Sequence, residues 1–410
     1  MIKTSYYQDL TKMNTFGMKV KARCFIEYDS VADLVDIEFE ELARPVLHIG
    51  GGSNLLFTDD FKGTVLHSKV NFIEILDEGQ CIPEAPSHSV GPSPEPAAAG
   101  FSLQRSTGPF AESLERVGKC LLHTNGTSSE DVDSTDTVTK NPSKSVIVSV
   151  GAGVVFDDFC AWAAKEGLWG VENLSYIPGE VGASAVQNIG AYGVEVKDVI
   201  RMVYCYDTVE EEFVRFSVDE CGYGYRDSIF KDPEIKGRYI VTHVVFALSR
   251  EPQPRLDYGH LKDAVLAEAA GRELTPAMIR KVIIKIRKEK LPEPSVMGSA
   301  GSFFKNPVMS AGQFAHIEAA AKAEHGPDCI VPHYNLPDGT VKVPAAWMIE
   351  QCGWKGRRSG GAAVWDKQPL VIVNYIGEAY PEEIVALEKR IIASVKAKFG
   401  VDLHPEVEHV

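Results

Sequence analysis

The chain has 410 residues and a net charge of −15 at pH 7. This length allows two or three domains, because a single hydrophobic core rarely grows beyond about 250–300 residues. The acidic balance disfavours a general nucleic-acid binder or a protein of anionic membranes, although it leaves room for a local basic pocket around a phosphorylated ligand.

The remaining composition is that of a soluble globular protein, with 44% hydrophobic and 24% charged residues. Residues 1–10 are polar and lack the apolar core of a signal peptide, and no apolar run approaches the roughly 20 residues that cross a bilayer. The 8 cysteines are scattered without a CxxC pair. We therefore expect reduced thiols in a cytoplasmic protein and no metal site.

In the first part of the chain, a short polar lead precedes a strand at 22–27, a helix at 30–42 capped by Ser30, and a buried strand at 45–49. That strand enters three glycines followed by Ser-Asn, and a further strand is expected at 63–66. A strand followed by glycines exposes consecutive backbone N–H groups, which favours a phosphate site. A glycine-rich hairpin is the alternative.

Residues 81–144 differ from the rest because prolines and small polar residues interrupt any periodicity. This composition predicts a disordered or loosely ordered insertion, with one helix near 110–117. We assign no chemistry to it.

Order is expected again from residue 145, with a strand at 145–150 and an amphipathic helix at 156–166 stopped by Gly167. Residues 177–193 then combine many small residues with Gln and Asn. These make a poor core and favour a surface against which a large planar or phosphorylated ligand lies, the alternative being an irregular tight loop. Strands are expected at 199–206, 212–216 and 239–248. Arg226, between them, suits a carboxylate fork or a plain surface ion pair.

The last part contains a helix that starts at Thr275-Pro276 and carries a basic face, which is either solvated or ligand-binding. Residues 298–307, GSAGSFFKNP, follow. Small residues let a ligand approach the backbone, so Ser302 is expected to present its hydroxyl in a tight, partly dry place. A glycine turn leading into a buried Phe303-Phe304 pair is the alternative. A strand is expected at 369–373 and a final helix at 382–399.

Seven motifs occur in one order over nearly the whole chain outside 81–144: NTFG (14–17), GGGSNLLF (50–57), IPGEVGASAVQNIGAYG (177–193), GYRDSIF (224–230), GSFFKNP (301–307), GGAAV (360–364) and PEV (405–407). The ordered set resembles the UDP-N-acetylenolpyruvoylglucosamine reductase (MurB) family. The loop at Tyr258 is similar to that of the subtype that closes a tyrosine over the substrate.

The resemblance implies an α+β fold: a two-part FAD-binding module of the vanillyl-alcohol-oxidase (PCMH) type, followed by an α+β substrate-binding domain. FAD-binding subdomain 1 is expected at 1–70 and subdomain 2, with the insertion, at 71–250. The substrate-binding domain is expected at 251–410.

The resemblance also implies an NADPH-dependent flavoenzyme of peptidoglycan precursor synthesis. It would reduce UDP-N-acetylglucosamine enolpyruvate to UDP-N-acetylmuramate, with non-covalent FAD passing hydride from NADPH to the vinyl carbon. A cytoplasmic monomer without nucleic-acid or membrane partners is expected.

Three residues match the family's catalytic positions. Arg226 and Glu406 would bind and polarise the substrate carboxylate, and Ser302 would protonate the α-carbon. Positions that match FAD contacts are Gly51, Gly52, Ser53, Asn54, Pro178, Gly179, Gly182, Ser184, Gln187, Asn188, Gly190 and Tyr192. Positions that match substrate contacts are Tyr225, Tyr258, Arg287, Lys290 and Asn306.

Three features depart from the family pattern: the insertion within the flavin-binding half, Ala183 where a small hydroxyl residue could sit, and Glu408 so close to Glu406 near the chain end. Two other functions stay open. One is an oxidase of the same fold, for which His48 would be the residue to check for a covalent flavin link. The other is a sensor that binds FAD without turnover.

Overall fold

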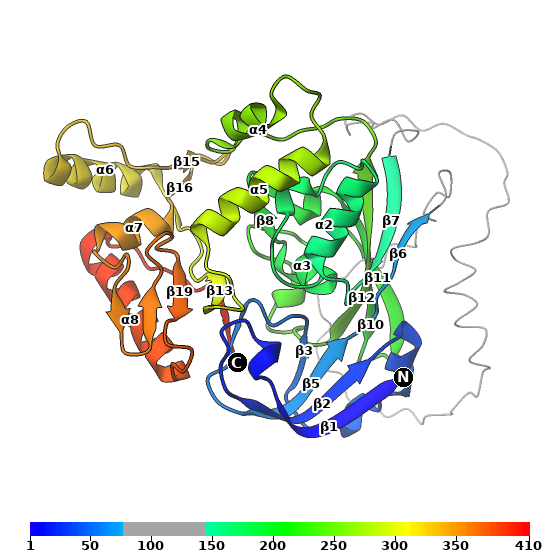
Figure 1. Cartoon of the computed structure of the whole chain (residues 1–410). Helices are drawn as coiled ribbons and strands as arrows, with labels where there is room; N and C mark the ends of the chain where they lie inside the picture. Colours follow the sequence, from blue (N-terminus) through cyan, green and yellow to red (C-terminus); the bar gives the residue numbers. More distant parts are fainter. Residues whose placement is uncertain (77–144) are drawn as a thin grey trace, which may run out of the picture.

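The computed structural model describes residues 1–76 and 145–410. The expected insertion and its helix near 110–117 lie outside these residues. Figure 1 shows one sheet near the N-terminus in blue, a second sheet in cyan and green, and a C-terminal part in yellow to red on the other side of helix α5.

The first sheet has the order β1-β2-β5-β3, and only the β1–β2 pair is antiparallel. Its strands are β1 (Ile2–Asp9), β2 (Lys21–Tyr28), β5 (Phe61–Ser68) and β3 (Val46–Ile49). The expected polar lead is therefore an edge strand. Its side chains are mostly exposed or half-buried, so the sequence has no strong apolar alternation to reveal it.

The helix expected at 30–42 is wrong in type. Ser30 caps the segment as predicted, accepting the N–H of Asp33, but the chain forms two short 3-10 helices, Val31–Asp36 and Phe39–Glu41. Leu34, Ile37 and Phe39 are all buried in one cluster. A continuous α-helix could not turn all three to one side, so the chain leaves helical geometry at Ile37.

The second sheet is antiparallel throughout, in the order β11-β10-β12-β7-β6. Its strands are β11 (Glu212–Ser217), β10 (Ile200–Asp207), β12 (Tyr239–Ser249), β7 (Ser145–Gly151) and β6 (Ile73–Leu76). Helices α2 (Phe156–Lys165) and α3 (Val181–Gln187) lie on one side of it (Figure 1). The predicted amphipathic helix and the predicted strand hairpin are confirmed.

The C-terminal part begins with α4 (Leu261–Ala269) and α5 (Pro276–Lys290), which pack together. Thr275 caps α5 as predicted. A sheet of order β13-β19-β18-β17 follows, made of β13 (Gly298–Ser302), β19 (Val371–Asn374), β18 (Ala362–Val364) and β17 (Arg358–Ser359). The other elements are α6 (Ala311–His325), α7 (Ala345–Gln351), the predicted α8 (Pro381–Phe399), β14 (Val308–Met309), β15 (Tyr334–Asn335) and β16 (Val341–Lys342).

One hydrophobic core joins the N-terminal segment to the C-terminal part. Phe16, Leu56 and Phe57 pack in the same cluster as Phe303 and Phe304, all nearly inaccessible to solvent. The buried phenylalanine pair is therefore confirmed.

The chain end is held against the same region. Strand β20 (Glu408–His409) pairs in parallel with β4 (Leu55–Leu56), and the N–H of Thr58 donates to the carbonyl of Val410 at 2.7 Å. The end of the chain thus lies beside the glycine-rich loop. In residues 1–76 and 145–410, no helix has the length and apolar character to cross a membrane.

Candidate functional site

The glycine-rich loop at 50–54 packs backbone against backbone with residues 178 and 179. Ser53 Oγ donates to the carbonyl of Pro178 at 3.1 Å. A Cβ on Gly51 would lie 3.7 Å from the Cα of Gly179. Gly52 has φ +59°, and a Cβ there would lie 2.0 Å from the carbonyl oxygen of Met13. Only glycine allows this turn and this approach together.

The NTFG motif at 14–17 connects that loop to strand β13. The N–H of Thr15 donates to the carbonyl of Gly52 at 3.2 Å, and the carbonyl of Thr15 accepts the N–H of Ser299 at 2.9 Å. A Cβ on Gly298 would lie 2.1 Å from the carbonyl oxygen of Phe16. The motif therefore sets the distance between the glycine loop and the strand that ends in Ser302.

Residues 181–187 form helix α3, so an irregular loop is wrong for this part of 177–193. A Cβ on Gly182 would lie 2.9 Å from the Cβ of Ala152, which indicates close helix packing. Ser184 is buried, and its hydroxyl donates to the carbonyl of Val181 at 2.7 Å. At these two expected flavin positions, Gly182 thus packs closely against Ala152 and the Ser184 side chain faces the protein interior.

Asn188 ends α3 in the left-handed conformation, with φ 44°. Its amide donates to Glu195 Oε2 at 3.1 Å and to the carbonyl of Gly224 at 2.7 Å. Its amide oxygen accepts the N–H of Lys197 at 3.3 Å. The side chain of this expected FAD contact therefore positions the loop that carries Arg226.

Arg226 joins that loop to the end of the chain. Its Nε donates to Glu406 Oε1 at 3.0 Å, Nη1 to the carbonyl of Asn188 at 3.3 Å, and Nη2 to the carbonyl of Gly190 at 2.5 Å. A guanidinium has five N–H donors, so with three in use two remain for a ligand. The Arg226–Glu406 pair is not a plain surface ion pair, because both side chains are only 17% exposed.

Glu406, rather than Glu408, faces Arg226. The N–H of Glu406 donates to the carbonyl of Phe303 at 2.8 Å, and its own carbonyl accepts Asn54 Nδ2 at 3.1 Å. Burial raises the pKa of the Glu406 carboxyl although Arg226, Lys231 and Lys305 counteract it. Glu408 instead forms an ion pair with Lys236.

Ser302 ends strand β13, directly before the residue whose carbonyl holds Glu406. It is exposed, so the expectation of a tight, partly dry place is wrong for the protein by itself.

Two of the expected substrate residues, Tyr225 and Tyr258, make ring contacts with neighbouring residues. Asn306 Nδ2 donates to the hydroxyl of Tyr225 at 3.2 Å, and Arg226 lies over the Tyr225 ring at 5.3 Å. Tyr258 packs edge-on against Tyr192 with 5.9 Å between ring centroids.

Two residues that the sequence did not reveal complete this cluster. Tyr334 stacks on Tyr258 at 6.3 Å, and Lys342 Nζ lies 4.7 Å from the centre of the Tyr225 ring. The two face each other across the β15–β16 pair. Their only signal in the sequence is a polar turn at 337–339, which does not place them near Tyr258.

The basic face of α5 is partly buried. The prediction of a solvated face is therefore wrong for Arg280 and Arg287. Arg280 forms an ion pair with Asp157 on α2, and Arg287 Nε donates to the carbonyl of Tyr176 at 3.0 Å. Burial lowers the pKa of the Arg287 guanidinium. Lys290, one turn later, is exposed.

His48 lies on β3, and its Nε2 is 2.9 Å from the hydroxyl of Tyr28 on a nearby strand. Burial lowers the pKa of His48 to about 4, so the ring is neutral at pH 7. In the described part of the chain, no cluster of three or more His, Cys, Asp or Glu side chains is suited to a metal ion.

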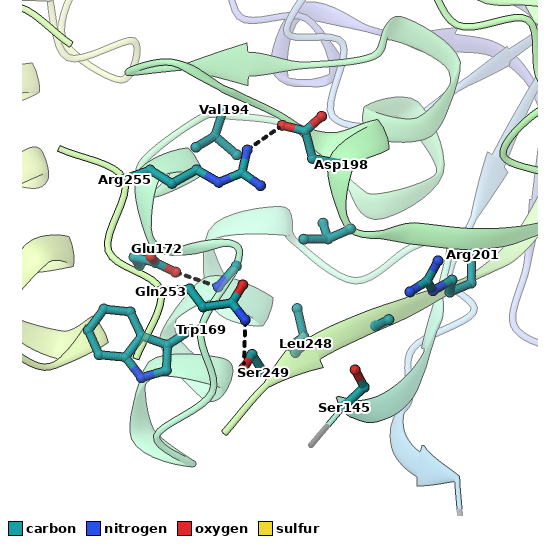
Figure 2. Close-up of a pocket in the computed structure, with 13 residues that line it drawn as sticks. Ser145, Trp169, Glu172, Val194, Asp198, Arg201, Leu248, Ser249, Gln253 and Arg255 are labelled. Carbon is teal, nitrogen blue, oxygen red and sulfur yellow. Dashed lines mark hydrogen bonds and ion pairs between the residues drawn. The ribbon is translucent and has the colours of Figure 1, made fainter. Parts of the chain in front are cut away.

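A separate cavity lies between the second sheet and the segment at 169–172 (Figure 2). Glu172 Oε2 accepts the N–H of Gly170 at 2.6 Å, and Arg255 pairs with Asp198 at 3.0 Å. None of the expected site residues lines it.

The chain is similar to proteins of one family over nearly all its length. A family model described as the C-terminal domain of UDP-N-acetylenolpyruvoylglucosamine reductase matches residues 293–410, and one described as an FAD binding domain matches 125–216. The UDP-N-acetylenolpyruvoylglucosamine reductase of Bacteroides fragilis is 44% identical over 402 residues, which are 98% of this chain and 98% of that protein. That of Porphyromonas gingivalis is 38% identical over 406 residues, 98% and 97% of the two chains.

Among solved structures, the MurB of Thermus caldophilus matches with a TM-score of 0.55 and 20% identity, covering 100% of this chain and 98% of that one. This match and the two family models confirm the expected fold, an FAD-binding module followed by an α+β domain. The chain belongs to the UDP-N-acetylenolpyruvoylglucosamine reductase (MurB) family.

Proposed function

We propose that this protein is an FAD-dependent reductase that uses NADPH to convert UDP-N-acetylglucosamine enolpyruvate into UDP-N-acetylmuramate for peptidoglycan synthesis. The observation that carries this proposal is the buried Arg226–Glu406 pair. It lies between the glycine loop, the end of α3 and the strand that ends in Ser302. These three segments supply a flavin site, a carboxylate site and a proton donor.

The residues fit FAD. Two glycine-lined loops face each other at 51–53 and 178–179, where any Cβ on Gly52 or Gly179 would meet neighbouring atoms within 3 Å. Exposed backbone N–H groups in such a place suit a pyrophosphate. We assign the flavin to Gly51, Gly52, Ser53, Asn54, Pro178, Gly179, Gln187, Gly190 and Tyr192, with Gly182, Ser184 and Asn188 supporting it from within the protein. Bound FAD would supply hydride transfer from NADPH to the vinyl carbon.

Arg226 and Glu406 would hold the enolpyruvyl carboxylate. The two unused N–H donors of Arg226 can bind a carboxylate. Burial raises the pKa of the Glu406 carboxyl and so favours its protonated form, which would donate to the same carboxylate. Negative charge grows on that group as hydride arrives, and one fixed donor in such a position contributes about 3–4 kcal/mol to lowering the barrier. Ser302 would then give its proton to the α-carbon.

The sugar nucleotide would lie along the tyrosine cluster. We assign it to Tyr225, Tyr258, Arg287, Lys290 and Asn306, and we add Tyr334 and Lys342. Two lysines and an arginine suit a diphosphate, and the stacked Tyr258–Tyr334 pair offers an aromatic face. Tyr258 is 44% exposed, which leaves it accessible to a ligand.

We also infer a cytoplasmic monomer. All assigned groups come from one chain, and the six cysteines in the described residues are free thiols. We further propose domain divisions near residues 70 and 250, because the first sheet ends at Ser68 and the second at Ser249.

The test is anaerobic and spectroscopic. The purified protein should show flavin absorbance, bleach with NADPH, and recover its colour on addition of UDP-N-acetylglucosamine enolpyruvate but not of UDP-N-acetylglucosamine. Recovery with oxygen alone would indicate an oxidase. Stable FAD binding without bleaching would indicate a sensor, and a protein that takes up no FAD would contradict the proposal.

A further inference from the structure

Lys231 contacts two parts of the site but has no role in the function as proposed above. It ends the short 3-10 helix Ile229–Lys231. Its Nζ donates to the carbonyl of Arg226 at 3.0 Å and to Gln187 Oε1 at 3.1 Å. One ammonium group therefore ties the arginine loop to the end of α3.

The backbone that Lys231 holds is strained. Arg226 has φ +55°, a left-handed conformation that costs a non-glycine residue free energy and persists only where neighbours hold it. From this backbone position its side chain reaches Glu406 and the carbonyls of Asn188 and Gly190. The bond from Lys231 falls on the carbonyl of the strained residue itself.

The charge of Lys231 also acts on the site. Lys231 faces the carboxylates of Asp227, Glu406 and Glu408 and the ammonium of Lys305. Lys231 is half-buried, and this burial lowers the pKa of its ammonium. The groups that face Glu406 are Arg226, Lys231 and Lys305, and each of the three favours its ionised form.

We propose that Lys231 is a positioning residue for the reduction of the enolpyruvyl substrate: it fixes the backbone of Arg226 against the flavin-binding segment and brings a positive charge to the side of the site that holds Glu406. This inference rests on the function proposed above. It predicts that Lys231 matters far more for reoxidation by substrate than for reduction by NADPH, because Arg226, whose backbone it holds, is assigned to the substrate carboxylate.

The experiment compares both half-reactions by stopped flow in Lys231→Met, Lys231→Arg and Lys231→Gln. Lys231→Met removes both bonds and the charge. It should slow reoxidation by the enolpyruvyl substrate about 10- to 100-fold, the effect of a small misplacement, and leave reduction by NADPH within about twofold. Lys231→Arg should restore much of the rate. Lys236→Met, at the surface pair with Glu408, is the control and should change neither half-reaction.

The pH profile of reoxidation separates this role from a structural one. Without the charge of Lys231, the pKa of Glu406 should rise. The limb of the pH–rate profile that follows the titration of Glu406 should therefore move to higher pH in Lys231→Met and Lys231→Gln but not in Lys231→Arg. Lys231→Gln keeps an amide donor and serves if Lys231→Met does not fold.

Three results would overturn the inference: unchanged reoxidation in Lys231→Met, an equal loss in both half-reactions, or an unmoved limb in Lys231→Gln. Failure of the wild-type protein to be reoxidised by the enolpyruvyl substrate would instead contradict the proposed function. The two failures are therefore distinguishable.

Discussion

At the scale of single residues, the proposed chemistry depends on one guanidinium held from three directions. Arg226 is bonded to the chain end through Glu406 and to the end of α3 through two backbone carbonyls. These bonds use three of the five N–H donors of the guanidinium. The side chain therefore has a fixed orientation, and two N–H donors stay available to bind a ligand.

Ser302→Ala should leave reduction of the flavin by NADPH intact and slow reoxidation by the enolpyruvyl substrate about 100- to 10,000-fold, the usual contribution of a general acid. The reason is that the hydroxyl would be required only after hydride transfer. Rapid-mixing absorbance near the flavin maximum measures both steps. Ser295→Ala, at an exposed serine on the preceding loop, is the control, and equal losses in both steps of Ser302→Ala would mean a structural role.

Glu406→Gln should raise stability at pH 7 while it lowers activity. Because burial raises the pKa of Glu406 in the folded state above the unfolded value of about 4.3, its contribution is complete below that value and is lost as pH rises through the folded pKa. A neutral amide avoids this loss. The difference in free energy of unfolding between variant and wild type should therefore be small near pH 4 and grow toward pH 7 in urea titrations at saturating FAD.

Glu383→Gln provides a control with the opposite sign. The N–H groups of Gly361 and Tyr380 lower the pKa of Glu383, so its stabilisation is present above the unfolded pKa and is lost as pH falls. Its variant should lose stability at pH 7 and approach wild type in acid. A pH-independent difference for Glu406→Gln would contradict the role of burial.

At the scale of elements, the site is assembled from ends and turns rather than from whole helices or strands. The glycine loop follows β3, Asn188 ends α3, Ser302 ends β13 and Glu406 precedes β20. The NTFG motif, which has no ionisable side chain, connects two of these ends through backbone hydrogen bonds.

Gly52→Ala should cost about 3 kcal/mol of stability and abolish FAD retention, because a Cβ there meets the carbonyl oxygen of Met13 at 2.0 Å and φ is positive. Gly17→Ala is a matched control: φ is +68°, but a Cβ meets nothing within 4 Å. It should cost only about 1 kcal/mol and keep the flavin. The ratio of absorbance at 450 nm to 280 nm after gel filtration reports FAD content, and equal losses in the two variants would show that the contact with Met13 is unimportant.

The sequence predicted those elements whose boundaries carry strong local signals. Thr275-Pro276 marked the start of α5, and the final helix expected at 382–399 ends at the residue where α8 ends. It missed β1, which is an exposed edge strand. It also predicted one helix where the chain forms two short 3-10 helices, because tertiary burial of Phe39 overrides local propensity. For the site, motifs supplied Arg226, Ser302 and Glu406. Tyr334 and Lys342 are brought near Tyr258 only by folding over long sequence distances, so local patterns could not reveal them.

At the scale of the whole molecule, α5 connects the flavin-binding half to the C-terminal part. It packs against α2 and α4 (Figure 1). The carbonyl of its C-terminal residue, Lys290, accepts a hydrogen bond from Trp365 Nε1 at 3.0 Å. Arg280 provides the charged contact with α2, where its Nη2 donates to Asp157 Oδ2 at 2.9 Å. The Arg280 side chain is 16% exposed and the Asp157 side chain is 24% exposed.

We expect this ion pair to stabilise the joined halves, in contrast to a neighbouring surface pair. Burial alone would raise the pKa of Asp157, but the bonds from Arg280 and the N–H of Tyr176 outweigh it and lower the pKa. Its stabilisation is therefore present above the unfolded pKa of about 3.9 and is lost as pH falls through the folded value.

A double-mutant cycle with Asp157→Asn and Arg280→Met should give a coupling of about 1–3 kcal/mol at pH 7 that declines below pH 4. The Lys281–Glu268 pair, whose lysine is 71% exposed on the same helix, should give a much weaker coupling. Equal coupling in the two cycles, measured by urea unfolding, would mean that α5 joins the halves through apolar packing alone.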